Sequence, residues 1–123
     1  MNLSMTASST GSQTVVEIAG EVDLHTAGRL ADRLTALLES GPRTLVVDLS
    51  SLSFLDSTGL GALVTVRNHA RRSGADLRLV CVPERLLKLF RITGLHTAFE
   101  IYPTLTQALA GGGSAANVPI GQG

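Results

Sequence analysis

The chain has few of the residues that build disulfides, metal sites or strongly charged surfaces. Of its 123 residues one is a cysteine and none is a tryptophan, and the formal net charge is zero. The lone Cys81 excludes an internal disulfide and a zinc site made of several cysteines, and its place in the apolar run LRLVCV predicts a buried structural thiol. The zero net charge removes the usual electrostatic basis for binding nucleic acid or an anionic membrane surface.

Long apolar runs are also missing. No uninterrupted stretch approaches the ~20 apolar residues that span a bilayer, and the N-terminal segment MNLSMTASST has neither the basic region nor the apolar core of a signal peptide. We therefore expect a cytoplasmic protein without membrane contact, and a monomer as the default. The charge is nevertheless uneven, because residues 1–62 hold three arginines against seven acidic residues, net −4, whereas residues 63–123 are net +4.

The residue patterns of common catalytic sites are absent. No lysine precedes Lys88, which excludes a Walker-type phosphate loop, and no glycine stands two residues before Ser57, which excludes a hydrolase nucleophile elbow. His25, His69 and His96 share no metal-ligand spacing. We expect no catalytic residue, no metal and no cofactor, hence a protein that is not an enzyme.

The apolar residues recur in an alternation of strand-like and helix-like segments. Strands are predicted at residues 3–8, 14–19, 44–49, 77–82 and 98–102, and helices at 26–39, 57–72, 83–90 and 104–110. This order predicts an α/β fold, a mixed and largely parallel sheet of four to five strands with about four helices packed on it. One domain should occupy residues 1–110, and the Gly-rich segment 111–123 should be a disordered tail.

A small polar group of residues, Asp56-Ser57-Thr58-Gly59, separates an apolar strand from a helix within the segment DLSSLSFLDSTGLGALV. On local grounds Asp56 or Ser57 caps the following helix. A cap needs only one such residue, and Gly59 and Gly61 cost helix stability, so something must come close to the backbone there. The local pattern leaves open whether that is a helix, a ligand or a partner protein. A serine at a helix N-terminus would also accommodate a phosphate group.

Four segments together resemble the STAS domain, specifically the stand-alone bacterial anti-sigma-factor antagonists. The resemblance runs from about residue 14 to residue 110. It is carried by GEVDLHTA (20–27), LVVDLSSLSFLDSTGLGALV (45–64), GADLRLVCVPERLLKLFRITGL (74–95) and FEIYPTLTQAL (99–109). The second segment is the specific one, because an apolar strand followed by a phenylalanine, the group Asp-Ser-Thr-Gly-Leu-Gly and a helix is an unusual combination.

The resemblance implies a regulatory switch. In the family a partner anti-sigma factor, a serine kinase with a histidine-kinase-like ATPase fold, phosphorylates the serine that Ser57 matches, and a metal-dependent phosphatase removes the phosphate. The unphosphorylated antagonist binds the anti-sigma factor and releases the sigma factor, which controls transcription. Thr58 is a secondary candidate for phosphorylation. The residues that would contact the partner are Asp23, Asp56, Thr58, Gly59, Leu60 and Gly61.

Other uses of the same domain remain as alternatives. STAS domains also occur as cytoplasmic tails of anion transporters and in stress-signalling scaffolds that do not release a sigma factor. The transporters carry membrane spans and the scaffolds carry a longer N-terminal sensor region, and this sequence has neither. A nucleotide-binding domain is a further alternative, although no phosphate loop or metal-ligand set supports it.

Overall fold

The computed structural model describes residues 2–111 and has the predicted order of strands and helices. The predicted tail therefore lies outside the described residues, except for Gly111. Its elements are β1 (Leu3–Thr10), β2 (Gln13–Val22), α1 (Ala27–Glu39), β3 (Thr44–Leu55), α2 (Ser57–Ser73), β4 (Asp76–Val80), α3 (Glu84–Ile92), the 3-10 turn η1 (Leu95–Thr97), β5 (Glu100–Tyr102) and α4 (Leu105–Ala110).

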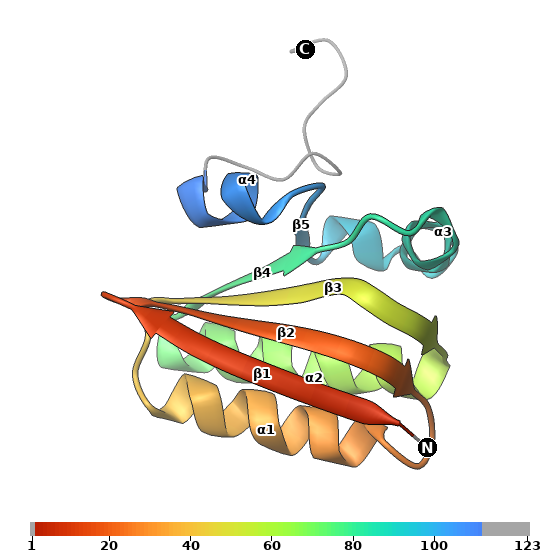
Figure 1. The fold of residues 1–123 in the computed structure, drawn as a ribbon, viewed down its shortest axis with the longest axis horizontal. Coiled ribbons are helices and arrows are strands. Elements are labelled where there is room, and N and C mark those ends of the chain that lie inside the picture. Colours follow the sequence, from red (N-terminus) through yellow and green to blue (C-terminus); the bar gives the residue numbers. More distant parts are fainter. Residues whose placement is uncertain (1, 112–123) are drawn as a thin grey trace, which may run out of the picture.

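The five strands form one sheet in the order β1-β2-β3-β4-β5. β1 is antiparallel to β2, and all the other neighbours are parallel. Each parallel pair is joined by a helix, and each crossover moves one strand further in the same direction. Because such crossovers are right-handed, their helices fall on one face of the sheet. Figure 1 shows α1 and α2 side by side beneath the strands, and α4 above them. The predicted fold class is confirmed.

The larger core lies between the sheet and the helices of the three crossovers. Leucines of α1 and α2 pack there against the alternate residues of β2, β3 and β4 that point to this face. α3 adds Leu86 and Phe90, and the Phe90 ring meets Phe99 edge to face, with 5.8 Å between the ring centroids. Burying one such side chain contributes about 1.5–3 kcal/mol, so this layer supplies most of the hydrophobic stabilisation.

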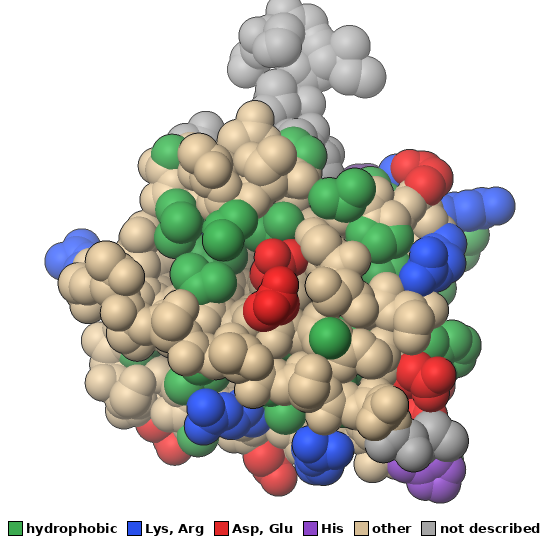
Figure 2. Space-filling model, in the orientation of Figure 1, with side chains coloured by type: hydrophobic (Ala, Val, Ile, Leu, Met, Phe, Trp, Pro, Cys, Tyr) green, Lys and Arg blue, Asp and Glu red, His purple; other side chains and the backbone are tan. Residues whose placement is uncertain are grey.

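The opposite face of the sheet is only partly covered. α4 packs there over a small second core of Val46, Val80, Tyr102 and Ala108. Further along the strands, Glu17 and Asp48 are register neighbours on β2 and β3, with Glu17 exposed and Asp48 half-buried. Figure 2 shows acidic side chains in the middle of the molecular face that it presents, with basic side chains toward the periphery. None of the helices within residues 2–111 combines the length and apolar character needed to cross a membrane.

Two strand ends differ from the predicted ones. β2 continues through Gly20 to Val22, three residues beyond the predicted end at residue 19. Gly20 has a φ of +107°, and a Cβ atom built on it would lie 2.1 Å from the carbonyl oxygen of Asn2, which accepts a hydrogen bond from the Glu21 N–H. The glycine is thus needed because the start of β1 passes very close to it.

β3 extends six residues beyond the predicted end at Leu49. In the extension the buried residues are Leu52 and Leu55, which recur every third residue and not every second. The pairing with β2 shows why, because the register shifts twice, between Glu17 and Ala19 and between Gly20 and Glu21 of β2. Each shift gives β3 one extra residue, which is a β-bulge. The bulges interrupt the two-residue alternation that predicts a strand, and they let β2 and β3 end together.

The close approach at Gly20 makes a testable prediction. Gly20→Ala should lower the free energy of unfolding by about 3 kcal/mol, because the strained φ is combined with a clash against backbone atoms. Gly11→Ala is the matched control, since Gly11 also has a positive φ, +60°, but nothing within 4 Å of a built Cβ. It should cost only about 1 kcal/mol. Urea unfolding of both variants measures the difference, and equal losses would contradict the close-contact explanation.

Candidate functional site

The candidate site lies at the edge where β2 and β3 end side by side. The last residues of the two strands, Val22 and Leu55, are register partners. The N–H of Asp56 donates a hydrogen bond to the carbonyl of Val22, with 3.3 Å between nitrogen and oxygen. Asp23 and Asp56 therefore begin adjacent loops, and α2 starts at this edge (Figure 1). The carboxyl ends of parallel strands are the usual place for binding sites in open α/β sheets.

The helix cap at this edge is Asp56 and not Ser57. Asp56 has an extended backbone, and its Oδ1 accepts a hydrogen bond from the N–H of Gly59 at 3.0 Å. Such a cap stabilises a helix by about 1 kcal/mol. The capping role, which the sequence allowed for either residue, thus belongs to Asp56. The Ser57 hydroxyl takes no part in the cap.

Ser57 and Thr58 occupy the first turn of the 17-residue helix α2, and both are exposed. Within residues 2–111 neither side chain has a hydrogen-bond partner, and the backbone N–H groups of these two residues donate to no acceptor. The N-terminus of a helix carries a partial positive charge, and its free N–H groups bind anionic oxygens well. An oxyanion attached to Ser57 would find two unused donors beside it.

The two glycines in the first turns of α2 have different surroundings. Gly59 is buried, and a Cβ atom there would lie 2.5 Å from Leu55 Cδ1 and 2.7 Å from Val22 Cγ1. This glycine lets α2 pack against the ends of β2 and β3. A Cβ atom on Gly61 would meet nothing within 4 Å, and Gly61 is exposed. The expectation that something approaches the backbone is thus met by the protein's own core at Gly59 and is left open at Gly61.

The residues expected to contact a partner therefore divide into two groups. Thr58 and Gly61 are exposed, and Asp23 and Asp56 are half-buried. Gly59 is buried and Leu60 is only 3% exposed. Leu60 packs in the main core, so its direct role is to hold α2 on the sheet. The surface that the accessible members of this set offer is small, polar and acidic.

Asp23 organises the loop between β2 and α1. Its Oδ1 accepts hydrogen bonds from the N–H groups of His25 (2.8 Å) and Thr26 (3.2 Å), and the buried Thr26 hydroxyl donates to the carbonyl of Glu21. Desolvation raises the pKa of Asp23, but the hydrogen bonds that its carboxylate accepts from the His25 N–H and from the N–H and hydroxyl of Thr26, together with the nearby His25, outweigh it and hold the pKa below its ordinary value of 3.8. The loop thus presents an ionised carboxylate in a defined position.

Two exposed apolar side chains at this edge were missed in the sequence. Leu24 is 72% exposed in the loop after Asp23, and Phe54 is 47% exposed near the end of β3. Phe54 is the register partner of Glu21, so both residues belong to the ends of neighbouring strands. Leu24 stands between polar residues in the segment GEVDLHTA, outside any apolar periodicity, and that isolation was the available signal.

The histidines and the cysteine of the described residues lie apart from one another. Within residues 2–111 no three His, Cys, Asp or Glu side chains are placed to hold a metal ion. The three histidines lie on separate elements, and His69 faces Glu39 at 3.9 Å. Cys81 is buried, as predicted; burial, followed by the nearby Asp48 carboxylate, raises the pKa of its thiol to about 11. A thiol in that state is protonated and unreactive at neutral pH.

Comparisons with known proteins agree on one family. The family model described as "STAS domain" matches residues 4–108. The anti-sigma-B factor antagonist of Bacillus subtilis is 37% identical over 101 residues, covering 82% of this chain and 92% of its own, and that of Staphylococcus aureus (strain NCTC 8325) is 34% identical, covering 82% and 94%. The crystal structure of an anti-sigma factor antagonist from Mycobacterium paratuberculosis superimposes with a TM-score of 0.81 at 29% identity, covering 89% of this chain and 92% of that one.

The contrast between the two glycines can be measured. Gly59→Ala should lower the free energy of unfolding by about 1–3 kcal/mol, because the added methyl group overpacks the contact with Val22 and Leu55. Gly61→Ala, two residues away in the same helix, should raise it by about 0.5–1 kcal/mol, because alanine is the better helix former. Chemical denaturation of the two variants tests this. If Gly59→Ala were as well tolerated as Gly61→Ala, the packing role of Gly59 would be wrong.

The lowered pKa of Asp23 predicts a pH-dependent contribution to stability. A carboxylate with a folded-state pKa below 3.8 stabilises the protein above that pH, and the contribution is lost as the pH falls through the folded-state pKa. Asp23→Asn should therefore destabilise the protein at pH 7, and the difference from the wild type should shrink as the pH falls below 3.8.

Asp32→Asn serves as the matched control for Asp23→Asn, because it removes the same charge from an exposed position on α1. It should change the free energy of unfolding by less than about 0.5 kcal/mol at either pH. A difference between wild type and Asp23→Asn that stayed constant from pH 7 down to pH 2.5 would contradict the role given to the loop carboxylate.

Proposed function

The chain belongs to the STAS domain family, and from this premise we propose that it is an anti-sigma-factor antagonist switched by phosphorylation of Ser57. When unphosphorylated it binds an anti-sigma factor and so frees a sigma factor for transcription. Its 37% identity to an anti-sigma-B factor antagonist over most of both chains supports this role. The observation that carries the switch is the free, exposed Ser57 hydroxyl at the start of α2.

The position of Ser57 supports a phosphate in three ways. The hydroxyl is exposed and makes no competing hydrogen bond within residues 2–111, so a kinase can reach it. The N–H groups of Ser57 and Thr58 are free, and a phosphate at a helix N-terminus is stabilised by such donors and by the helix dipole. Asp56 holds the cap independently, so modification of Ser57 leaves the helix start intact. Thr58 shares the exposure and is the secondary site.

The electrostatics of this edge suit an on-off switch. Asp23 and Asp56 already make it acidic, which fits a basic surface on the partner. A phosphate adds about −1.5 to −2 charges at neutral pH. That charge would lie beside Asp56. It would face a partner surface that is complementary to Asp23, Asp56 and a small neutral hydroxyl. Added bulk and unmatched charge at the centre of an interface cost several kcal/mol, enough to end the interaction.

The partner that this surface fits is an anti-sigma factor that is itself a serine kinase of the histidine-kinase-like ATPase fold. Leu24 and Phe54 would supply apolar contacts around the charged centre, and the exposed Gly61 would let the partner lie flat on the first turns of α2. A metal-dependent serine phosphatase would reset the switch. In this scheme the chain is a cytoplasmic regulator, and the catalytic groups belong to its partners.

Two variants test the switch. Ser57→Ala should bind the cognate anti-sigma factor within about threefold of the unphosphorylated wild type, whereas Ser57→Glu should bind at least about 30-fold more weakly because it places a charge where the phosphate would lie. Thr65→Glu is the matched control, because it adds the same charge to an exposed position of α2 two turns further on. Calorimetry of each variant with the purified partner gives the affinities.

Phosphosite mapping completes this test. Incubation with the same anti-sigma factor and ATP should label Ser57 in the wild type, and Ser57→Ala should take up no comparable label. Phosphate at another residue, or equal binding of Ser57→Ala and Ser57→Glu, would refute the assignment. A loss of binding in Thr65→Glu as large as in Ser57→Glu would show a general charge effect and not a gate at Ser57.

A further inference from the structure

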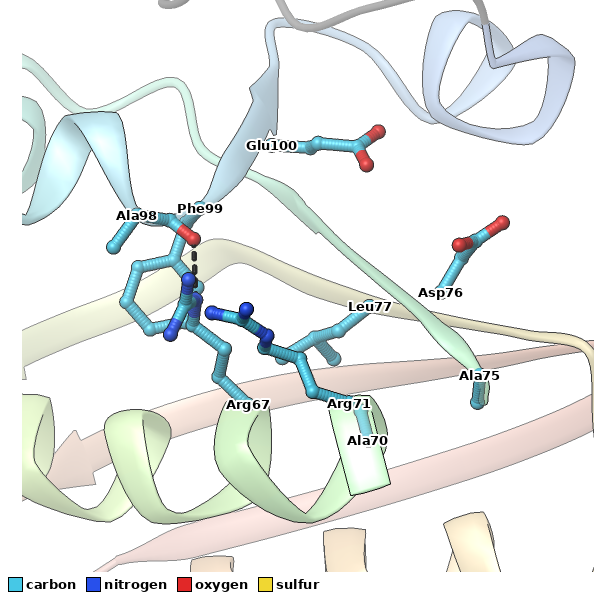
Figure 3. Close-up of a pocket in the computed structure, with 9 residues that line it drawn as sticks. All are labelled: Arg67, Ala70, Arg71, Ala75, Asp76, Leu77, Ala98, Phe99 and Glu100. Atoms are coloured by element: carbon cyan, nitrogen blue, oxygen red, sulfur yellow. Dashed lines mark hydrogen bonds between the residues drawn. The ribbon is translucent and has the colours of Figure 1, made fainter. Parts of the chain in front are cut away.

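A pocket of about 190 Å³ lies at the other end of α2, between the last turns of that helix and the beginnings of β4 and β5. Its lining residues are Arg67, Ala70, Arg71, Ala75, Asp76, Leu77, Ala98, Phe99 and Glu100. Figure 3 shows the two arginine side chains rising from α2 into the pocket and the Phe99 ring beside Arg67. The floor is apolar, and the charged groups stand around it.

The two arginines line one pocket, and neither has a counter-ion within residues 2–111. Arg67 is half-buried, and its Nε donates a hydrogen bond to the carbonyl of Ala98 at 2.6 Å, which fixes the direction of the side chain. Arg71, four residues further along α2, is exposed and lines the same pocket. Neither arginine forms an ion pair with any of residues 2–111. Four donor N–H bonds of Arg67 and five of Arg71 therefore have no protein acceptor.

The two carboxylates of the pocket are engaged elsewhere. Arg78 lies 3.6 Å from the Asp76 carboxylate and 3.7 Å from that of Glu100, and the Tyr102 hydroxyl donates to Glu100 at 2.9 Å. In Figure 3 both carboxylates point away from the guanidinium groups of Arg67 and Arg71. The acidic residues thus pair with Arg78, and not with Arg67 or Arg71.

Helix stability alone does not account for this arrangement. A basic residue in the last turn of a helix interacts favourably with the helix dipole, and both Arg71 and Arg72 lie there. That explains a cation in the last turn, but Arg72 meets the requirement without lining the pocket. Like charges four residues apart on a helix repel each other, so placing Arg67 and Arg71 together costs stability unless an anion lies between them.

We propose that this pocket binds a small organic oxyanion, a carboxylate or phosphate group attached to a short apolar body. The head group would be held by the two guanidinium groups, which suit planar, bidentate recognition of oxyanions. The apolar body would lie against Ala75, Leu77 and Ala98, the partly exposed apolar residues of the lining. Arg67 follows Ser57 by ten residues on α2, about 15 Å at 1.5 Å per residue, so the site is separate from the proposed switch and goes beyond the proposed function.

Titration of the isotope-labelled protein with small anions, followed by NMR, tests the proposal. Benzoate and phenyl phosphate supply the two head groups on one apolar body, and benzyl alcohol supplies that body without a charge. We expect benzoate, phenyl phosphate or both to shift the amide signals of Arg71, Ala98 and Phe99 in a saturable manner, while benzyl alcohol shifts none of them. The stronger of the two anions identifies the head group.

Variants separate a specific site from general surface charge. Arg71→Gln should weaken the binding of the preferred anion by about tenfold, because one of the two guanidinium groups is lost. Arg72→Gln removes the same charge from the neighbouring position outside the pocket and should weaken it less than about twofold. Ser57→Glu should leave the binding unchanged. Non-saturable shifts, equal losses in Arg71→Gln and Arg72→Gln, or shifts spread over the surface would overturn the proposal.

Discussion

The parallel pairing of β2 with β3 is the contact on which the rest of the molecule depends. These are the two longest strands of the sheet. Two bulges in β3 absorb its extra residues, so that Val22 and Leu55 end the paired region together. α1 and α2 pack against the same strands, and the N–H of Asp56 is tied to the carbonyl of Val22. The candidate site is therefore a direct continuation of the most extensively paired part of the fold.

Within that edge each residue has a separate task, and this separation makes a switch physically reasonable. Asp56 caps the helix, Gly59 and Leu60 fit it against the core, and the side chain of Ser57 makes no hydrogen bond within residues 2–111. A change at Ser57 can alter the charge of the surface without loosening the helix beneath it. Because α2 is also a central element of the main core, the surface around Ser57 is held rigidly.

The two ends of α2 carry different kinds of hydrogen-bond donor that could bind an anion. At its start, free backbone N–H groups and the helix dipole favour an oxyanion attached to Ser57. In its last turns, Arg67 and Arg71 offer side-chain donors over an apolar floor. The uneven charge of the sequence follows the same division. The acidic half supplies the loops after β2 and β3, and the basic half supplies most of α2 and all of α3.

The order of the elements, the limits of α1 and α2 and the position of Ser57 at a helix start followed from the sequence alone. These features depend on local properties, namely apolar periodicity, the Gly-Pro and Gly stops and the capping preference of Asp. The family resemblance added the regulatory role, because its motif is contiguous around Ser57.

Other features became visible only in the tertiary structure. The extension of β3 depends on bulges opposite β2, the need for glycine at position 59 depends on Val22 and Leu55, and the direction of the Arg67 side chain depends on the carbonyl of Ala98. The physical reason is the same in each case. Periodicity and capping are interactions between residues near in sequence, whereas register, close packing and the surroundings of a charge are set by residues that only folding brings together.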